Sequence, residues 1–167
     1  MSDTTVTASS VLGRRDDPEF AGRVPDTVTV AWDEASKPRL RRTSALGRDV
    51  LVDVGRGHYL ADGDVLADDG ATVIVVERPS ERALVVRLDP TCPVAQLVHD
   101  ALRLGHAFGN QHVPLEPDGT TVIVPLTTSE DVARRTVESL DLGTAAVAVE
   151  DVRIGCRAPL NPGHQHS

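Results

Sequence analysis

Residues Pro93–Gly105 read PVAQLVHDALRLG, and this segment predicts the first long helix of the chain. Counted from Val94, six of its apolar and small residues recur at relative positions 0, 3, 4, 7, 8 and 11. This spacing places them on one face of an α-helix, and Pro93 is suited to the first helical turn. We therefore expect an amphipathic helix that begins close to Val94.

The segments on either side of this helix extend the pattern. A β-strand is predicted before it at 84–88, and two short strands at 113–116 and 121–126 flank a Pro-Asp-Gly turn after it. A capping-box spacing at 128–131 begins a second helix, and 144–152 is the last predicted strand. The order strand, helix, hairpin, helix, strand is the βαββαβ order of the ferredoxin-like fold.

The N-terminal half has the patterning of strands alone. Residues 28–32 alternate at period two, and 50–54 and 72–76 are β-branched runs. The clusters Asp-Gly-Asp at 62–64 and Asp-Asp-Gly at 68–70 are turn sequences. This half therefore predicts a small all-β domain.

These patterns predict an α+β chain with four parts. Residues 1–22 are polar and aperiodic, and we expect a disordered arm there. The all-β N-terminal domain is expected at 23–82, and the ferredoxin-like metal-binding domain at 83–155. Residues 156–167 hold Pro, Gly and His, and are expected to be a flexible tail.

Composition narrows the classes of function. The chain has 167 residues with 17 Lys and Arg against 25 Asp and Glu, a formal charge of −8. This acidity argues against nucleic acid or an anionic membrane as a partner. The chain has no apolar run of the ~20 residues that cross a bilayer, and its first residues lack the order of a signal peptide. We expect a cytoplasmic protein.

The sequence does not predict an enzyme. No Ser or Cys nucleophile lies in a recognisable elbow or loop, and no glycine-rich phosphate loop is present. The acidic turn clusters lack the spacing of an EF-hand loop. Cys92 and Cys156 are too few for a disulfide scaffold, although a single bridge between them stays open.

Histidines are the candidate metal ligands. His164 and His166 lie two residues apart, so both imidazoles point to one side of an extended chain. Imidazole suits nickel, copper and zinc. His112 follows Gly109-Asn110 at a predicted helix-to-strand turn, and two copies of it across a two-fold axis supply two ligands. The alternatives are incidental tail histidines, the remnant of an expression tag, and a structural or solvent-facing His112.

Three segments resemble one known family. Gly109–Leu115, GNQHVPL, resembles the His-Leu-Gly-Asn-Arg-His-x-Pro-Leu motif of the UreE urease accessory proteins, which are nickel metallochaperones. Arg39–Thr43 and Gly57–Leu66 are similar to the basic strand and the Arg-Gly-x-x-Leu-x-Asp-Gly-Asp-x-Leu stretch of the family's N-terminal domain. Ala158–His166 looks like a shortened form of its Pro-rich, His-bearing C-terminus.

The resemblance implies a nickel carrier that delivers Ni²⁺ to urease apoprotein during urease maturation. It implies a homodimer formed through the second domain, with His112 of both subunits on one ion and with His164 and His166 adding to that site. Zn²⁺ or Cu²⁺ can substitute as cargo, and the accessory GTPase of urease is the implied partner.

Two positions depart from the motif. Ala107 stands at its first His, with His106 displaced by one residue, and Gln111 replaces its Arg.

Three other functions remain open at this point. The first is a general zinc- or copper-binding buffer or sensor module. The second is a small enzyme on a ferredoxin-like scaffold, because a fold does not determine a function. The third is a protein–protein adaptor, whose oligomeric state and stability nickel would not change.

Overall fold

The computed structural model describes residues 5–143 and 145–155. The chain divides into two compact units, Met1–Pro79 and Ser80–Ser167. The described elements of the first unit are β1 (Thr5–Ala8), β2 (Gly13–Arg14), η1 (Pro18–Phe20), β3 (Val24–Thr29), β4 (Arg39–Thr43), β5 (Asp49–Asp53), β6 (Asp64–Asp68) and β7 (Thr72–Glu77). They form two sheets with the strand orders β1-β5-β4 and β2-β6-β7-β3. The prediction of an N-terminal β domain is confirmed.

The core of the first unit explains its strand sequences. Val50 and Val52 on β5 pack in one apolar cluster with Ile74 and Val76 on β7, so the two sheets share this core. The alternate residues of β7 belong to a second cluster with Phe20 of η1. Because both of its faces are buried, β7 carries an uninterrupted apolar run rather than an alternating one.

The expectation of a disordered arm at 1–22 is wrong for the described residues 5–22. β1 pairs in parallel with β5, and Ala8 lies opposite Val52 with 2% of its surface exposed. Phe20 is also buried. The pairing partner of β1 lies more than 40 residues away in the sequence, so the polar local composition contains no trace of it.

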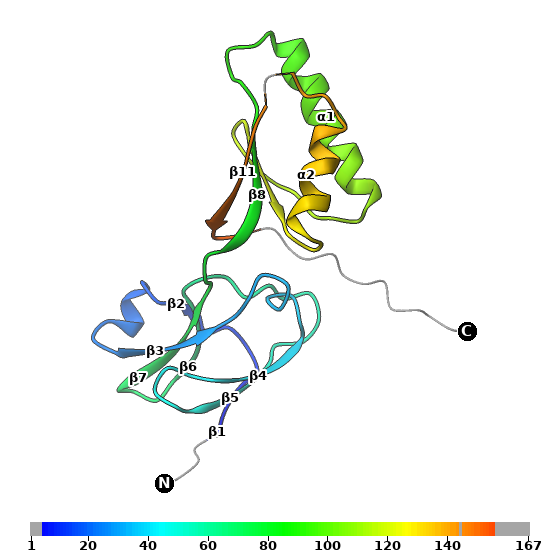
Figure 1. The fold of residues 1–167 in the computed structure, drawn as a ribbon. Coiled ribbons are helices and arrows are strands. Elements are labelled where there is room, and N and C mark those ends of the chain that lie inside the picture. The colour runs from blue at the N-terminus through cyan, green and yellow to red at the C-terminus, as the bar shows by residue number, and fades with distance from the viewer. Residues whose placement is uncertain (1–4, 144, 156–167) are drawn as a thin grey trace. The chain divides into compact units, whose positions relative to one another are not determined.

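The second unit has a four-stranded antiparallel sheet covered by two helices. Its described elements are β8 (Glu81–Arg87), α1 (Val94–Asn110), β9 (Glu116–Asp118), β10 (Thr121–Pro125), α2 (Glu130–Glu138) and β11 (Ala146–Val152). The strand order is β11-β8-β10-β9, and every neighbouring pair is antiparallel. Both helices lie on the same face of the sheet (Figure 1). Within the described residues, no helix has the length and apolar character needed to cross a membrane.

The apolar face predicted for α1 is only partly buried. Leu104 and Phe108 pack in the core between the helices and the sheet, and Leu97 packs against that core. Three other residues of the predicted apolar face are largely exposed to solvent. The exposed fractions are 75% for Val94, 50% for Val98 and 69% for Leu102. We call these three residues the α1 stripe.

The carboxyl group of Asp69, in the turn between β6 and β7, predicts how the stability of the protein depends on pH. The backbone N–H groups of Thr72 and Ala71 and the guanidinium of Arg48 donate to Asp69, and they lower the pKa of this carboxyl to about 2. Because the unfolded carboxyl titrates near 4, ionised Asp69 stabilises the fold above that pH, and the contribution is lost as the pH falls toward 2. Urea unfolding should show Asp69→Asn less stable than the parent at pH 7, with a smaller difference at pH 3.

The control for this prediction is Asp16→Asn, which removes an exposed carboxylate elsewhere in the same unit. Its effect on the free energy of unfolding should be small at both pH values. An Asp69→Asn deficit of equal size at pH 7 and pH 3 would contradict the assigned role of the charge.

Candidate metal centre

The site begins at the C-terminal end of α1. The helix ends at Asn110, and the chain then closes on its own last carbonyl groups. The N–H of His112 donates to the carbonyl of Gly109 at 3.0 Å, and the N–H of Val113 donates to the carbonyl of Phe108 at 3.0 Å. These two bonds are those of a Schellman motif. They put His112 in the left-handed region, with φ 55°.

The local sequence accounts for this closure. A Schellman motif is commonly accompanied by an apolar contact across its hydrogen bonds. Phe108 is buried in the core of the second unit, and the partly buried Val113 packs against that core. Pro114 follows, and proline cannot continue a helix. Glycine is the usual residue at the left-handed position, because a side chain there costs about 1–2 kcal/mol. Histidine at this position is therefore a backbone outlier of the kind that gathers at functional sites.

The surroundings of His112 favour a cation. Its side chain is exposed, and within the described residues it has no hydrogen-bond or ion-pair partner. It follows a 17-residue helix whose last turn holds no basic residue. The carbonyl end of a helix carries partial negative charge, which attracts cations. An ion bound by the His112 imidazole would lie in this field.

The other described histidines do not complete a site around His112. Nε2 of His106 lies 3.0 Å from Nδ2 of Asn110, and this ring is exposed. His58 and His99 are exposed as well. In the ranges 5–143 and 145–155, no group of three or more His, Cys, Asp or Glu side chains is placed to hold a metal ion. His164, His166 and Cys156 lie outside the described residues.

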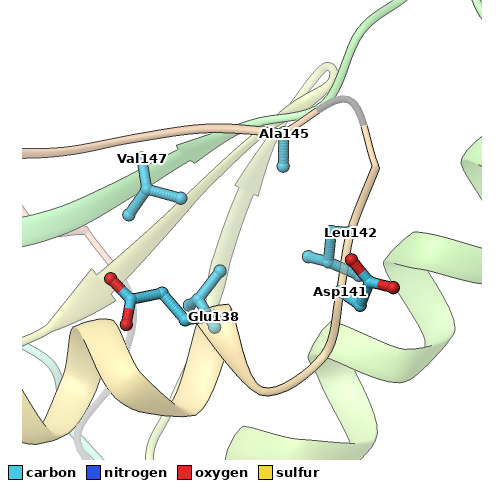
Figure 2. A pocket seen from close by; sticks show the side chains of 6 residues that line it. Glu138, Asp141, Leu142, Ala145 and Val147 are labelled. Carbon is cyan, nitrogen blue, oxygen red and sulfur yellow. The ribbon is translucent and has the colours of Figure 1, made fainter.

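A cavity of about 240 Å³ lies elsewhere in the second unit, between the end of α2 and the start of β11. Its lining residues are Val137, Glu138, Asp141, Leu142, Ala145 and Val147. The two carboxylates lie on opposite sides of it and do not point toward a common position (Figure 2). This cavity is therefore a poor candidate for a metal site.

The structure adds one contact that sequence reasoning did not predict. Oε2 of Glu116 accepts a hydrogen bond from the N–H of Gly155 at 2.6 Å. Glu116 comes directly after the GNQHVPL segment, and Gly155 directly precedes the tail that carries His164 and His166. The two residues are 39 positions apart, so no local pattern indicates their contact.

Known proteins are similar to part of this chain. Residues 8–78 match the family model described as UreE urease accessory protein, N-terminal domain. A urease accessory protein UreE of Burkholderia orbicola is 40% identical over 98 residues, and that of Methylibium petroleiphilum is 41% identical over 91. The N-terminal part of this chain is therefore similar to UreE urease accessory proteins. The resemblance seen in its sequence is confirmed.

The matches with UreE proteins are partial. The aligned part covers 58% of this chain and 44% of the Burkholderia UreE, and 54% and 40% for the Methylibium UreE. For the UreE of Yersinia rohdei, 37% identical over 106 residues, the shares are 61% and 46%. The matched part of this chain thus spans less than half the length of these relatives. They are named as accessory proteins, and their names state no catalytic activity.

The left-handed conformation predicts the effect of glycine at position 112. His112→Gly removes the steric cost of a side chain at φ 55°, so thermal or urea unfolding should show unchanged or higher stability, with a gain of up to about 1 kcal/mol. His112→Val, which puts a β-branched side chain in the same conformation, should destabilise the protein. A clear loss of stability in His112→Gly would mean that the imidazole supports the fold.

Proposed function

We propose that this protein is a nickel metallochaperone that delivers Ni²⁺ to urease apoprotein during urease maturation. The similarity to UreE urease accessory proteins supports the urease pathway. The observation that carries the proposal is the position of His112. Its side chain is exposed, its backbone is in the left-handed region, and it lies at the C-terminal end of α1, which carries partial negative charge. A fold that needed only a helix stop there would be served better by glycine.

The proposed site is completed by a second copy of the chain. One imidazole is an incomplete ligand set, whereas an isologous homodimer brings the same residue twice to its two-fold axis. Imidazole nitrogens bind such ions at ~2 Å, so the axis must pass close to His112 and hence close to the C-terminal end of α1. His164 and His166 are the proposed additional ligands. A set of separate imidazoles suits a carrier, because each ligand can leave while the others hold the ion.

The α1 stripe is the proposed dimer surface. Val98 and Leu102 continue through Gly105 and Gly109 at spacings of 4, 3 and 4 residues, which keeps them on one side of the helix. The small residues lie at the end near His112, where a second backbone could approach closely. At 1.5 Å per residue, Leu102 is ~15 Å along the helix from His112. An interface centred on the two-fold axis would therefore extend to the stripe and cover it.

The family's architecture is proposed for the second unit. Its βαββαβ element order, its sheet order β11-β8-β10-β9 and its two helices on one face support a ferredoxin-like metal-binding domain. The urease apoprotein and the accessory GTPase of urease are the proposed partners. A zinc or copper buffer is the competing function, and titration of the three metals at matched pH separates it from nickel delivery when urease activation is also measured.

The proposed ligands predict a ranking of nickel affinities. Calorimetric titration should show a loss of more than about tenfold in Ni²⁺ affinity for His112→Gly, because both halves of the shared ligand pair are removed. The double variant His164→Ala/His166→Ala should lose less. The control His99→Ala removes an exposed histidine of α1 and should bind as the parent does. Unchanged nickel binding by His112→Gly would contradict the proposal.

The proposed interface predicts the effect of charge on the α1 stripe. Leu102→Glu should convert the dimer to monomer in analytical ultracentrifugation, because it buries an unpaired carboxylate of each subunit in an apolar interface. It should leave the unfolding temperature of the monomer nearly unchanged, since Leu102 is 69% exposed. The matched control is Val132→Glu on α2, where Val132 is 45% exposed outside the stripe. Equal dimerisation by Leu102→Glu and the parent would exclude this surface.

A further inference from the structure

We propose that His106 is a further ligand of the shared nickel site, so that each subunit of the dimer supplies two imidazoles from the second unit. The inference rests on the proposed function and deepens it, because it names more of the donor set. Within one chain, His106 and His112 leave the site incomplete, whereas a second copy doubles both. The supporting observations are the place of His106 on α1, its hydrogen bonding, and its separation from His112 along the helix.

His106 lies at the edge of the α1 stripe. It follows Leu102 by four residues and precedes Gly109 by three, and residues at these spacings are neighbours on a helix surface. Leu102 is 69% exposed, and the His106 side chain is exposed as well. A second subunit that covers Leu102 and Gly109 therefore also covers His106.

Burial in this interface requires partners for both nitrogens of the His106 ring. A buried polar group that makes no hydrogen bond and binds no metal costs free energy. Asn110 is one partner, because its Nδ2 atom lies 3.0 Å from Nε2 of His106. Within residues 5–143 and 145–155, the other ring nitrogen, Nδ1, has no hydrogen-bond partner. A cation held between the subunits would supply the missing partner.

Asn110 can hold the ring in the form that binds a metal. An asparagine amide carries a donor on one side and an acceptor on the other, and a half-turn of the amide exchanges them. When Oδ1 faces the ring, Nε2 of His106 carries the proton and donates it to Asn110, so the lone pair of Nδ1 is available to a cation. Histidines that bind metals commonly donate their other ring N–H to a carbonyl or carboxylate in this way.

The level of Gly109 on α1 suits the two-fold axis. Gly109 is three residues from both His106 and His112, which is a rise of ~4.5 Å to either side. An imidazole side chain and a metal–nitrogen bond of ~2 Å together span such a rise. A Cβ atom added to Gly109 would meet nothing within 4 Å in the chain, although glycine lowers the stability of a helix relative to alanine. A close approach of the partner's backbone at this level would account for the glycine.

The resulting donor set is four imidazoles, two from each subunit. Four nitrogen donors suit the square-planar or tetragonal geometry that Ni²⁺ and Cu²⁺ adopt. The two His112 imidazoles would supply only half of this set. With His106, the second unit of the dimer would form a nickel site from its described residues, and the tail histidines would add to it.

The experiment counts imidazoles on the bound ion by X-ray absorption spectroscopy of the full-length dimer loaded with one Ni²⁺. The reference is the His164→Ala/His166→Ala variant, which removes the other proposed ligands. It should show four imidazoles, and the further change His106→Ala should leave two. Calorimetric titration should show nickel affinity lowered by about tenfold or more. The control His99→Ala removes another exposed histidine of α1 and should change neither quantity.

Variants of Asn110 test the orienting role in the same reference protein. Asn110→Ala should lower nickel affinity, because the ring of His106 loses the acceptor that fixes its proton on Nε2. Asn110→Asp keeps an acceptor for that N–H and should bind nickel at least as tightly as the reference. Equal affinity of Asn110→Ala and the reference would overturn the orienting role.

Stability and affinity together decide the role of His106. Metal-free His106→Ala should unfold at the temperature of the reference, because the side chain is exposed. An unchanged imidazole count with unchanged affinity would overturn the inference. A loss of affinity accompanied by a lower unfolding temperature would make His106 a structural residue and would overturn it as well.

The proposed function fails by a different result. If His112→Gly binds nickel normally, the shared site itself is wrong. If His112→Gly loses nickel and His106→Ala keeps both the imidazole count and the affinity, only the role of His106 is wrong.

Discussion

The proposed site depends on how α1 stops. A helix leaves its last carbonyl groups without partners, and here the N–H groups of His112 and Val113 take two of them. This closure needs one residue in the left-handed region, and His112 occupies it. Backbone hydrogen bonding therefore determines where the imidazole stands. The burial of Phe108 in the core and the packing of Val113 against that core keep the turn in place.

The start of β9 and the end of β11 lie at the same end of the second unit as His112. Strand directions bring the start of β9 and the end of β11 there, and the bond between Glu116 and Gly155 joins them. The α1 stripe extends away from this end along an exposed helix face. A two-fold axis beside His112 would thus bring together the α1 stripe, the imidazoles that bind the cation and the start of the tail in one dimer.

Much of the fold could be predicted from the sequence. Helices, hairpin and strands of the second unit follow from residue spacing and turn chemistry, which act over a few positions. His112 could be singled out because its neighbours resemble a family motif. The prediction of a disordered arm at 1–22 failed for reasons of distance. The pairing of β1 with β5 and the burial of Phe20 depend on partners remote in the sequence, so the polar N-terminal residues looked unstructured.

Helix α1 shows most clearly what the sequence determined and what only the tertiary structure decided. Its apolar residues divide into a buried face and an exposed face. Spacing determined that Leu97, Val98 and Leu102 lie on one side of a helix, because 3.6 residues make a turn in any context. It did not determine which part of that side meets the sheet. Only the packed structure decides this, and it buries Leu104 and Phe108 while leaving the α1 stripe in solvent. Burial is a property of which surfaces meet, and a single stretch of chain does not contain its partner.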